Sequence, residues 1–238
     1  MKESTEIRSY NKHDIAVYLH DTGLKNIVIF CHGYRGDSTG PNRFFVRTAR
    51  MFAEKGISSI RFDQYGSGNS TGDFLESRFN DWVATTQAIA RNYLEQGYKV
   101  SLFGQSMGGS TVVAVTAQIP ELTAVVAWVP DASIDEFVWP EEGFIEEAGQ
   151  RVSPVFWQEA HSANIANQYR QIEVPMYIVQ CTADEYVSEQ NRQVFVKGAK
   201  PQHIVDTYEG YSHSSWTYDQ ASEIIKKSVD FLDHTFKD

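Results

Sequence analysis

Five short segments of this chain are apolar at nearly every position, and segments with helix-like spacing of apolar residues lie between them. The apolar segments are residues 27–31, 57–62, 100–103, 124–129 and 176–181. Strands that are buried on both faces of a parallel sheet have this continuous apolar character. The helix-like segments are residues 44–55, 79–95, 107–118, 189–196 and 218–236. This alternation predicts a three-layer α/β fold with a mostly parallel sheet.

Three further strand candidates are more polar than these five. Residues 7–9 and 13–20 come first in the chain, and we expect them to form an antiparallel edge of the sheet. Residues 203–208 form a later strand candidate that begins with a histidine. A length of 238 residues favours one domain with an insertion over two separate domains.

Residues 131–174 interrupt the alternation, because a connection this long between two buried strands is unusual. Its stretch 131–160 carries eight acids and one base, Arg151; the acids are Asp131, Asp135, Glu136, Glu141, Glu142, Glu146, Glu147 and Glu159. The same stretch carries the aromatic residues Phe137, Trp139, Phe144, Phe156 and Trp157. We expect a short helical cap (131–174) on a core formed by 1–130 and 175–238. The alternative is a surface loop that packs its own aromatic side chains.

The overall charge excludes some classes of partner. The chain has 21 basic and 31 acidic residues, a formal net charge of −10. An acidic body repels phosphate backbones, so we expect neither a nucleic-acid nor a membrane partner. The histidines and cysteines show no metal-ligand spacing, and Gly66-Ser67-Gly68 lacks the third glycine of a dinucleotide fingerprint. The sequence therefore predicts neither a metal nor a cofactor.

The cysteines and the hydropathy indicate the compartment. Cys31 and Cys181 each end an apolar segment, which predicts buried, reduced thiols. The N-terminal residues contain no apolar stretch, and no segment approaches the ~18 apolar residues that suggest a membrane span. We therefore expect a cytoplasmic protein, and a homodimer is compatible with the sequence.

The pattern Gly-x-Ser-x-Gly occurs three times, with Ser38, Ser70 and Ser106 at its centre. The pattern carries chemistry where a serine lies on a sharp turn directly between a strand and a helix, because its hydroxyl then projects clear of the sheet. Of the three, Ser106 meets this condition: residues 99–103 form the strand before it and residues 107–118 the helix after it. Ser38 and Ser70 lie in loops, where turn chemistry explains the glycines. We predict that Ser106 is the nucleophile.

A serine hydroxyl needs a base to take its proton, and the base needs an acceptor to hold its tautomer. Among the seven histidines, His213 lies in a turn after a predicted strand, where open α/β sheets gather their ligands. Asp184 follows the strand 176–181 and is the favoured acid, with Asp131 as the competitor and Glu185 as a partial substitute.

The negative charge that develops on the substrate oxygen needs two fixed amide donors. We assign them to the backbone amides of Met107, which follows the nucleophile, and Tyr34, which follows the strand 27–31. His32 lies in the same loop and is predicted to have a structural role.

The order Ser106, Asp184, His213 resembles that of the α/β-hydrolase superfamily. Three segments are similar to small bacterial carboxylesterases of the cinnamoyl/feruloyl esterase type: His32-Gly33-Tyr34, residues 61–70 (RFDQYGSGNS) and residues 104–109 (GQSMGG). This resemblance implies an α/β-hydrolase fold with a cap inserted between strands 6 and 7 of the sheet. One departure is Cys181, which stands where these relatives usually carry a glycine.

These residues predict a cofactor-independent serine carboxylesterase that acts through an acyl-enzyme on small, uncharged acyl or aryl esters. The aromatic residues of the cap would supply an apolar pocket, and its acids would disfavour anionic substrates. The alternatives are a feruloyl/cinnamoyl esterase proper, a thioesterase, a monoacylglycerol lipase and a peptidase. A ligand-binding regulator that keeps the fold without turnover is the non-enzyme alternative.

Overall fold

The computed structural model describes residues 2–138, 140–141, 143–147 and 149–237. Its main sheet has eight strands in the order β1-β2-β4-β3-β5-β6-β9-β10. These strands are β1 (Lys2–Tyr10), β2 (His13–Asp21), β3 (Asn26–Cys31), β4 (Ser58–Phe62), β5 (Lys99–Gln105), β6 (Val125–Trp128), β9 (Met176–Cys181) and β10 (His203–Tyr208). The β1–β2 and β2–β4 pairs are antiparallel and all other pairs are parallel. The predicted antiparallel edge is therefore present as β1 and β2.

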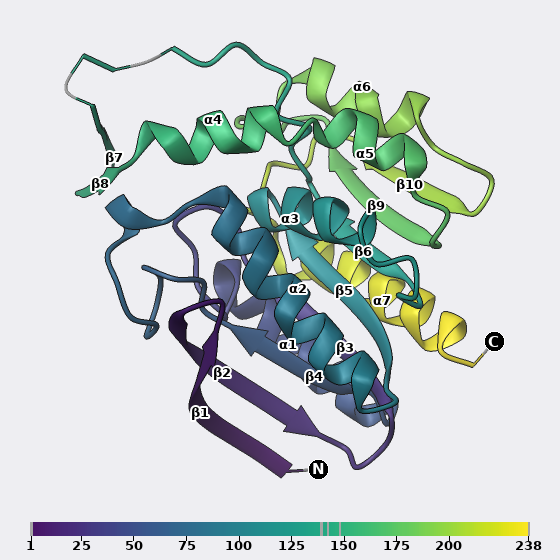
Figure 1. Cartoon of the computed structure of the whole chain (residues 1–238). Helices are drawn as coiled ribbons and strands as arrows, with labels where there is room; N and C mark the ends of the chain where they lie inside the picture. Colours follow the sequence, from purple (N-terminus) through teal and green to yellow (C-terminus); the bar gives the residue numbers. More distant parts are fainter. Residues whose placement is uncertain (1, 139, 142, 148, 238) are drawn as a thin grey trace.

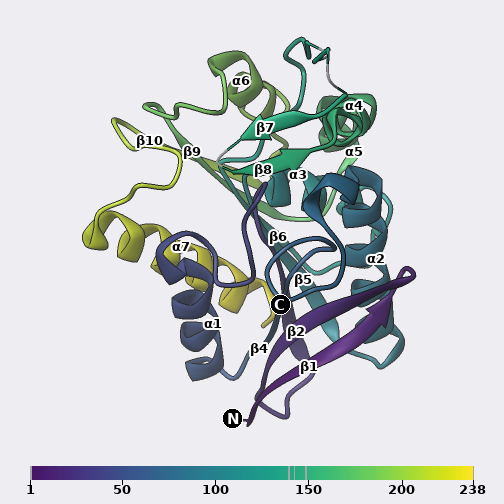
Figure 2. The same ribbon diagram turned by 90° about the vertical axis from the view of Figure 1, so that its left-hand side faces the viewer.

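Helices cover both faces of this sheet (Figure 1, Figure 2). They are α1 (Phe44–Glu54), α2 (Phe79–Glu95), α3 (Met107–Thr116), α4 (Pro154–Ser162), α5 (Ile165–Gln171), α6 (Glu189–Lys197) and α7 (Tyr218–Thr235), with short 3₁₀ turns at Pro41–Arg43 and Phe74–Glu76. One buried cluster joins the sheet to α1 and α7, and the other joins it to α2, α3 and the helices α4 to α6. The three-layer α/β fold is confirmed.

The periodic segments form the elements that their patterns predict, because their apolar residues fill the two buried layers. The helix α2 and the strand β9 have the predicted bounds. In β3, β5 and β6 almost every residue is buried, as a strand covered on both faces requires. Cys31 and Cys181 are buried free thiols.

The segment 131–174 lies between β6 and β9, the sixth and seventh strands of the main sheet along the chain. It contains α4, α5 and an antiparallel hairpin of β7 (Ile145–Glu147) and β8 (Gln150–Val152). Figure 1 shows the hairpin and α4 beyond the end of the sheet where β5 leads into α3. Phe156 is fully buried in the core, as the predicted apolar underside requires. Trp139 and Glu142 lie outside the described residues.

Candidate active site

Ser106 lies at the tight turn between β5 and α3. Its φ of 56° and ψ of −124° are unusual for a residue other than glycine. The turn is held from both sides, because the Ser106 amide donates to the carbonyl of Trp128 on β6 and its carbonyl accepts from the Ser110 amide in α3. The structure therefore confirms the strand–turn–helix context on which the prediction of Ser106 rested.

Glycines flank this turn because the chain passes close to itself there. A Cβ atom on Gly108 would lie 2.2 Å from the carbonyl oxygen of Cys31, and one on Gly104 would lie 2.2 Å from the carbonyl oxygen of Gly108. These distances are far below van der Waals contact and involve backbone atoms. The two glycines thus let α3 begin directly against β3 and β5, so that the serine between them stands at the rim of the sheet.

The other two Gly-x-Ser-x-Gly serines have roles in turns, and both are connected to Asp63. The Ser38 amide donates to a carboxylate oxygen of Asp63 at 2.6 Å. The Ser70 hydroxyl donates to the carbonyl of Asp63 at 2.6 Å and accepts from the Ala16 amide at 2.8 Å. Asp63 itself is almost fully buried. Sequence reasoning did not single out Asp63, although its place directly after β4 and before a glycine-rich loop was a usable signal.

His213 and Asp184 meet at the ends of the strands β10 and β9. The Nδ1 atom of His213 lies 2.7 Å from Oδ2 of Asp184, and the Asp184 side chain is fully buried. The other carboxylate oxygen accepts from the amides of Tyr186 and Val187. Glu185 does not replace Asp184, since its carboxylate instead accepts from the His213 backbone amide at 3.1 Å. The sequence-predicted pair is therefore brought together.

The surroundings of Asp184 favour its ionised form. Burial alone would raise its pKa, but the hydrogen bond and charge of His213, together with the Val187 and Tyr186 amides, lower the pKa below its ordinary value. An ionised carboxylate can only accept hydrogen bonds, so Nδ1 of His213 carries the ring proton. The Nε2 atom of the same ring is then left with a free electron pair that can take a proton.

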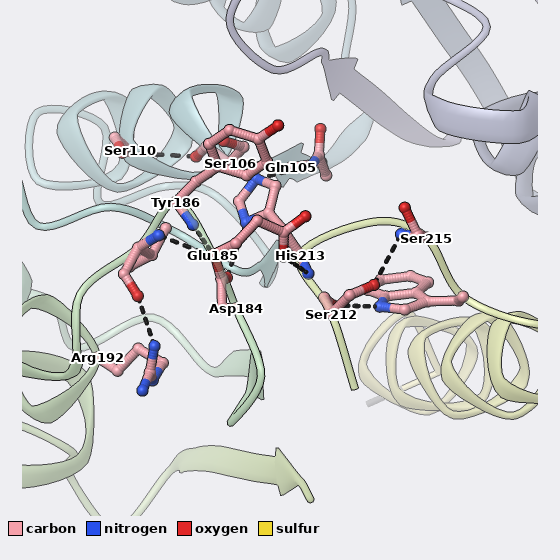
Figure 3. A network of polar contacts seen from close by, with 12 residues as sticks. Gln105, Ser106, Ser110, Asp184, Glu185, Tyr186, Arg192, Ser212, His213 and Ser215 are labelled. Atoms are coloured by element: carbon pink, nitrogen blue, oxygen red, sulfur yellow. Dashed lines mark hydrogen bonds and ion pairs between the residues drawn. The ribbon is translucent and has the colours of Figure 1, made fainter. Parts of the chain in front are cut away.

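Ser106 and His213 line one cavity, and Figure 3 shows the imidazole between the Asp184 carboxyl and the turn that carries Gln105 and Ser106. Among the described residues, the polar neighbour of Nε2 is the side-chain amide of Gln105, at a long 3.4 Å, rather than the Ser106 hydroxyl. Gln105 is therefore a site residue that sequence reasoning missed. The signal available in the sequence was that Gln105 is polar and directly precedes the predicted nucleophile.

The loop after β3 places the Tyr34 amide at the site. Among the described residues, neither the Tyr34 amide nor the Met107 amide has a hydrogen-bond acceptor, and both residues line the cavity of Ser106. A Cβ atom on Gly33 would lie 3.2 Å from Cβ of Ser106, which shows how closely this loop approaches the serine. Both residues whose amides the sequence assigned to the substrate oxygen therefore line the cavity of Ser106.

His32 fixes the same loop, as its predicted structural role requires. Its Nδ1 atom lies 2.8 Å from the carbonyl oxygen of Gly33, and its Nε2 atom accepts from the Gln64 amide at 3.0 Å. Burial lowers its pKa, so the ring is neutral with the proton on Nδ1. His32 thus uses both ring nitrogens to connect the loop to the chain after β4.

The segment 131–174 contacts this loop through α4 and β7. The indole nitrogen of Trp157 in α4 donates to the Tyr34 hydroxyl at 3.1 Å, and the two rings pack with their centroids 4.7 Å apart. The Arg35 guanidinium donates to the Glu147 carboxylate of β7 at 3.1 Å. Residues 131–174 therefore hold the side chains of Tyr34 and Arg35, which belong to the loop that carries the Tyr34 amide.

The cavity at Ser106 has a volume of about 460 Å³, within the ~300–1,000 Å³ common for small-molecule sites. Tyr34, Trp157 and Tyr186 give it an aromatic lining. A larger hollow of about 630 Å³ lies near Arg8 at the opposite end of the sheet, and neither Ser106 nor His213 lines it.

The charges around the cavity are mainly negative. Asp37, Asp131 and Glu147 line it, and Arg35, the one lysine or arginine among its described lining residues, is paired with Glu147. Burial raises the pKa of Asp131, against the opposing effect of the hydrogen bond from the Ser133 amide. Asp131 does not hydrogen-bond to His213 among the described residues, so the competing acid of the sequence analysis lies at the site without contacting the base.

The described part of the chain contains no group of three or more histidine, cysteine, aspartate or glutamate side chains that could hold a metal ion. None of its helices has the length and apolar character needed to cross a membrane.

The sheet order, the helical layers and the serine at the turn after β5 define the class of this protein, which has the α/β-hydrolase fold. The family model described as serine aminopeptidase, S33 matches residues 22–158, and the chain belongs to this family. The superfamily predicted from the sequence is thereby confirmed.

Solved structures show the same fold over nearly the whole chain. Est1E from Butyrivibrio proteoclasticus, solved with ferulic acid bound, has a TM-score of 0.86 at 19% identity over 98% of this chain and 100% of its own. The monoacylglycerol lipase of Paleococcus ferrophilus has a TM-score of 0.74 at 17% identity over 93% of this chain and 99% of its own.

A curated relative matches a smaller part of the chain. It is an uncharacterized 31.7 kDa protein of Escherichia coli from the traX-finO intergenic region, 26% identical over 126 residues. The match spans 51% of this chain and 43% of the relative.

Proposed function

We propose that this chain is a serine carboxylic ester hydrolase with Ser106 as nucleophile, His213 as base and Asp184 as the acid that orients it. The observation that carries the proposal is the 2.7 Å contact between His213 and Asp184, because His213 lines the same cavity as Ser106, a serine held in a strained turn. Because Asp184 holds the proton of His213 on Nδ1, Nε2 is free to accept the serine proton.

In the proposed reaction, Nε2 exchanges its long contact with Gln105 for the Ser106 hydroxyl. The oxygen of Ser106 forms a bond to the ester carbonyl carbon while its proton passes to Nε2. The carbonyl oxygen becomes an oxyanion that accepts from the amides of Tyr34 and Met107. The ester bond then breaks, the alcohol leaves with the proton from Nε2, and an acyl-enzyme remains. Water repeats the sequence and releases the acid.

The cavity supports an uncharged acyl or aryl group as the preferred substrate. The aromatic side chains of Tyr34, Trp157 and Tyr186 offer apolar surface, and a volume of about 460 Å³ accommodates a small ester. Asp37 and Asp131 form no ion pair among the described residues, and their charges disfavour anionic groups close to the serine. In this proposal residues 131–174 act as the cap, with Trp157 and Glu147 holding the loop that carries the Tyr34 amide.

A substrate panel tests the proposed specificity. We expect kcat/KM to be highest for neutral short-chain or aryl esters, such as p-nitrophenyl acetate or a methyl hydroxycinnamate. We expect it to be at least about 100-fold lower for an aminoacyl p-nitroanilide of similar size. A matched thioester and a long-chain ester complete the panel. Faster cleavage of the anilide would replace the esterase proposal with a peptidase, and a sharp optimum at hydroxycinnamates would narrow it to a feruloyl esterase.

A further inference from the structure

A buried arginine outside the active site has no anionic partner. Arg61 on β4 is only 7% exposed. Its Nη1 donates to the carbonyl of Ser38 at 2.9 Å, and its guanidinium lies 5.4 Å from the centre of the Tyr18 ring. Its Nε atom is buried without a hydrogen-bond acceptor, and no ion pair joins Arg61 to a described carboxylate. Buried charges are normally paired, because removing them from water is costly.

The carboxylates near Arg61 bind other donors. Asp63 accepts from the amides of Ser38 and Asn69 and from the Tyr18 hydroxyl. Asp37 accepts from the amide and hydroxyl of Thr39. Glu3 lies 3.6 Å from the ring of His20. None of these acids therefore satisfies the guanidinium of Arg61.

Arg61 opens onto a cavity of about 270 Å³, which is much more than the ~30 Å³ that one water molecule occupies. Two more arginines line it, Arg43 at the start of α1 and Arg50 within α1. Both are exposed, and among the described residues neither forms an ion pair. We call this space the arginine cavity. Three guanidinium groups without an ion pair among the described residues thus line one hollow, together with the carboxylates of Glu3, Asp37 and Asp63 that bind other donors.

We propose that the arginine cavity is a binding site for a small oxyanion, either a carboxylate or a phosphate group, held by Arg61 with Arg43 and Arg50 at its rim. Planar guanidinium groups match both kinds of oxyanion, since each can donate two parallel hydrogen bonds. The buried Nε atom of Arg61, which has no acceptor in the fold, supplies a donor for the anion.

The electrostatics of the arginine cavity agree with this assignment. Burial lowers the pKa of Arg61, and the charges of Tyr18, Asp63 and Glu3 do not offset that effect. A bound anion would provide the missing compensation. The arginine cavity is distinct from the cavity of Ser106, although Asp37 and Thr39 line both. An anion bound there would therefore lie behind the loop that separates the two cavities.

The test measures anion binding by thermal unfolding and by calorimetry, at constant ionic strength, with sodium phosphate and sodium acetate as probes and sodium chloride as reference. We expect saturable stabilisation by one or both probes. Saturation by phosphate alone identifies a phosphate ligand, and saturation by acetate alone a carboxylate. The absence of saturable binding for both would overturn the proposal.

Arg50→Gln provides the variant, because Arg50 is exposed and its loss leaves the core intact, whereas a substitution of Arg61 endangers folding. We expect Arg50→Gln to weaken the affinity for the bound probe about tenfold, as the loss of a charge-assisted hydrogen bond implies. Arg91→Gln is the matched control, since Arg91 is an exposed helical arginine of α2 that does not line the arginine cavity. We expect it to keep the affinity within twofold. Equal weakening by the two variants would show an effect of net charge and would contradict the site.

Discussion

Replacing Ser106 by alanine is expected to lower kcat for p-nitrophenyl acetate by about 10⁶-fold, the scale seen when a serine nucleophile is removed. The reason is that the acyl-enzyme of the proposed reaction forms on the Ser106 hydroxyl. The amides of Tyr34 and Met107, which we propose bind the carbonyl oxygen, remain in the variant, so weak residual catalysis should persist. The measurement is steady-state hydrolysis over a range of ester concentrations, with unfolding curves to verify that the fold is unchanged.

Ser38→Ala is the matched control for this prediction. Ser38 lies in the same Gly-x-Ser-x-Gly pattern, but its backbone, not its hydroxyl, makes its recorded hydrogen bonds. We expect Ser38→Ala to keep kcat within about threefold. Full activity in Ser106→Ala, or a collapse of activity in Ser38→Ala with the fold intact, would show that our assignment of Ser106 as the nucleophile is wrong.

Asp184→Asn is expected to lower kcat by about 10⁴-fold with little change in KM, as found when the triad acid is replaced by its amide. An asparagine can donate to Nδ1, and the ring proton then moves to Nε2, which is the atom that must accept the proton of Ser106. Asp131→Asn removes a carboxyl from the same cavity without disturbing a contact to His213, and we expect it to change kcat by less than tenfold. A larger loss of kcat in Asp131→Asn than in Asp184→Asn would show that Asp131 is the acid that orients His213.

Asp184→Asn is also expected to change the stability of the fold, by an amount that depends on pH. The pKa of Asp184 is lowered in the folded state, so its ionised form contributes stability above about pH 4, and this contribution is lost as the pH falls through the folded-state pKa. The free energy of unfolding of the wild type should therefore exceed that of Asp184→Asn at neutral pH, and the gap should narrow in acid. Urea unfolding at several pH values measures this difference. A gap that widens in acid would contradict the lowered pKa of Asp184 in the folded state.

Local sequence features were sufficient to predict the core strands and the polar residues that directly follow them. The continuous apolar character of β3, β5 and β9 is a direct consequence of burial on both faces, so it can be read without knowing the neighbours. Asp184 and His213 could be predicted because each follows a strand, and parallel strands bring such positions to one edge. The turn at Ser106 was predictable because its flanking elements are adjacent in the sequence.

The contacts of segment 131–174 could not be predicted in the same way. Its hairpin has two three-residue strands that are mostly exposed, so β7 and β8 lack an apolar pattern. The contacts Trp157–Tyr34 and Arg35–Glu147 join residues more than 100 positions apart, which no local period encodes. The lack of an ion pair at Arg61 could not be predicted from the sequence either. It depends on the hydrogen bonds that the Asp63 carboxylate accepts from other groups in the folded chain.

The most direct measurement is mass spectrometry of the protein after brief reaction with p-nitrophenyl acetate and quenching in acid. Our account predicts one acetyl group per chain, located by fragmentation on Ser106, and no such adduct in Ser106→Ala. An acetyl group on a different residue that hydrolyses at the rate of turnover, or turnover without any covalent adduct under single-turnover conditions, would contradict it.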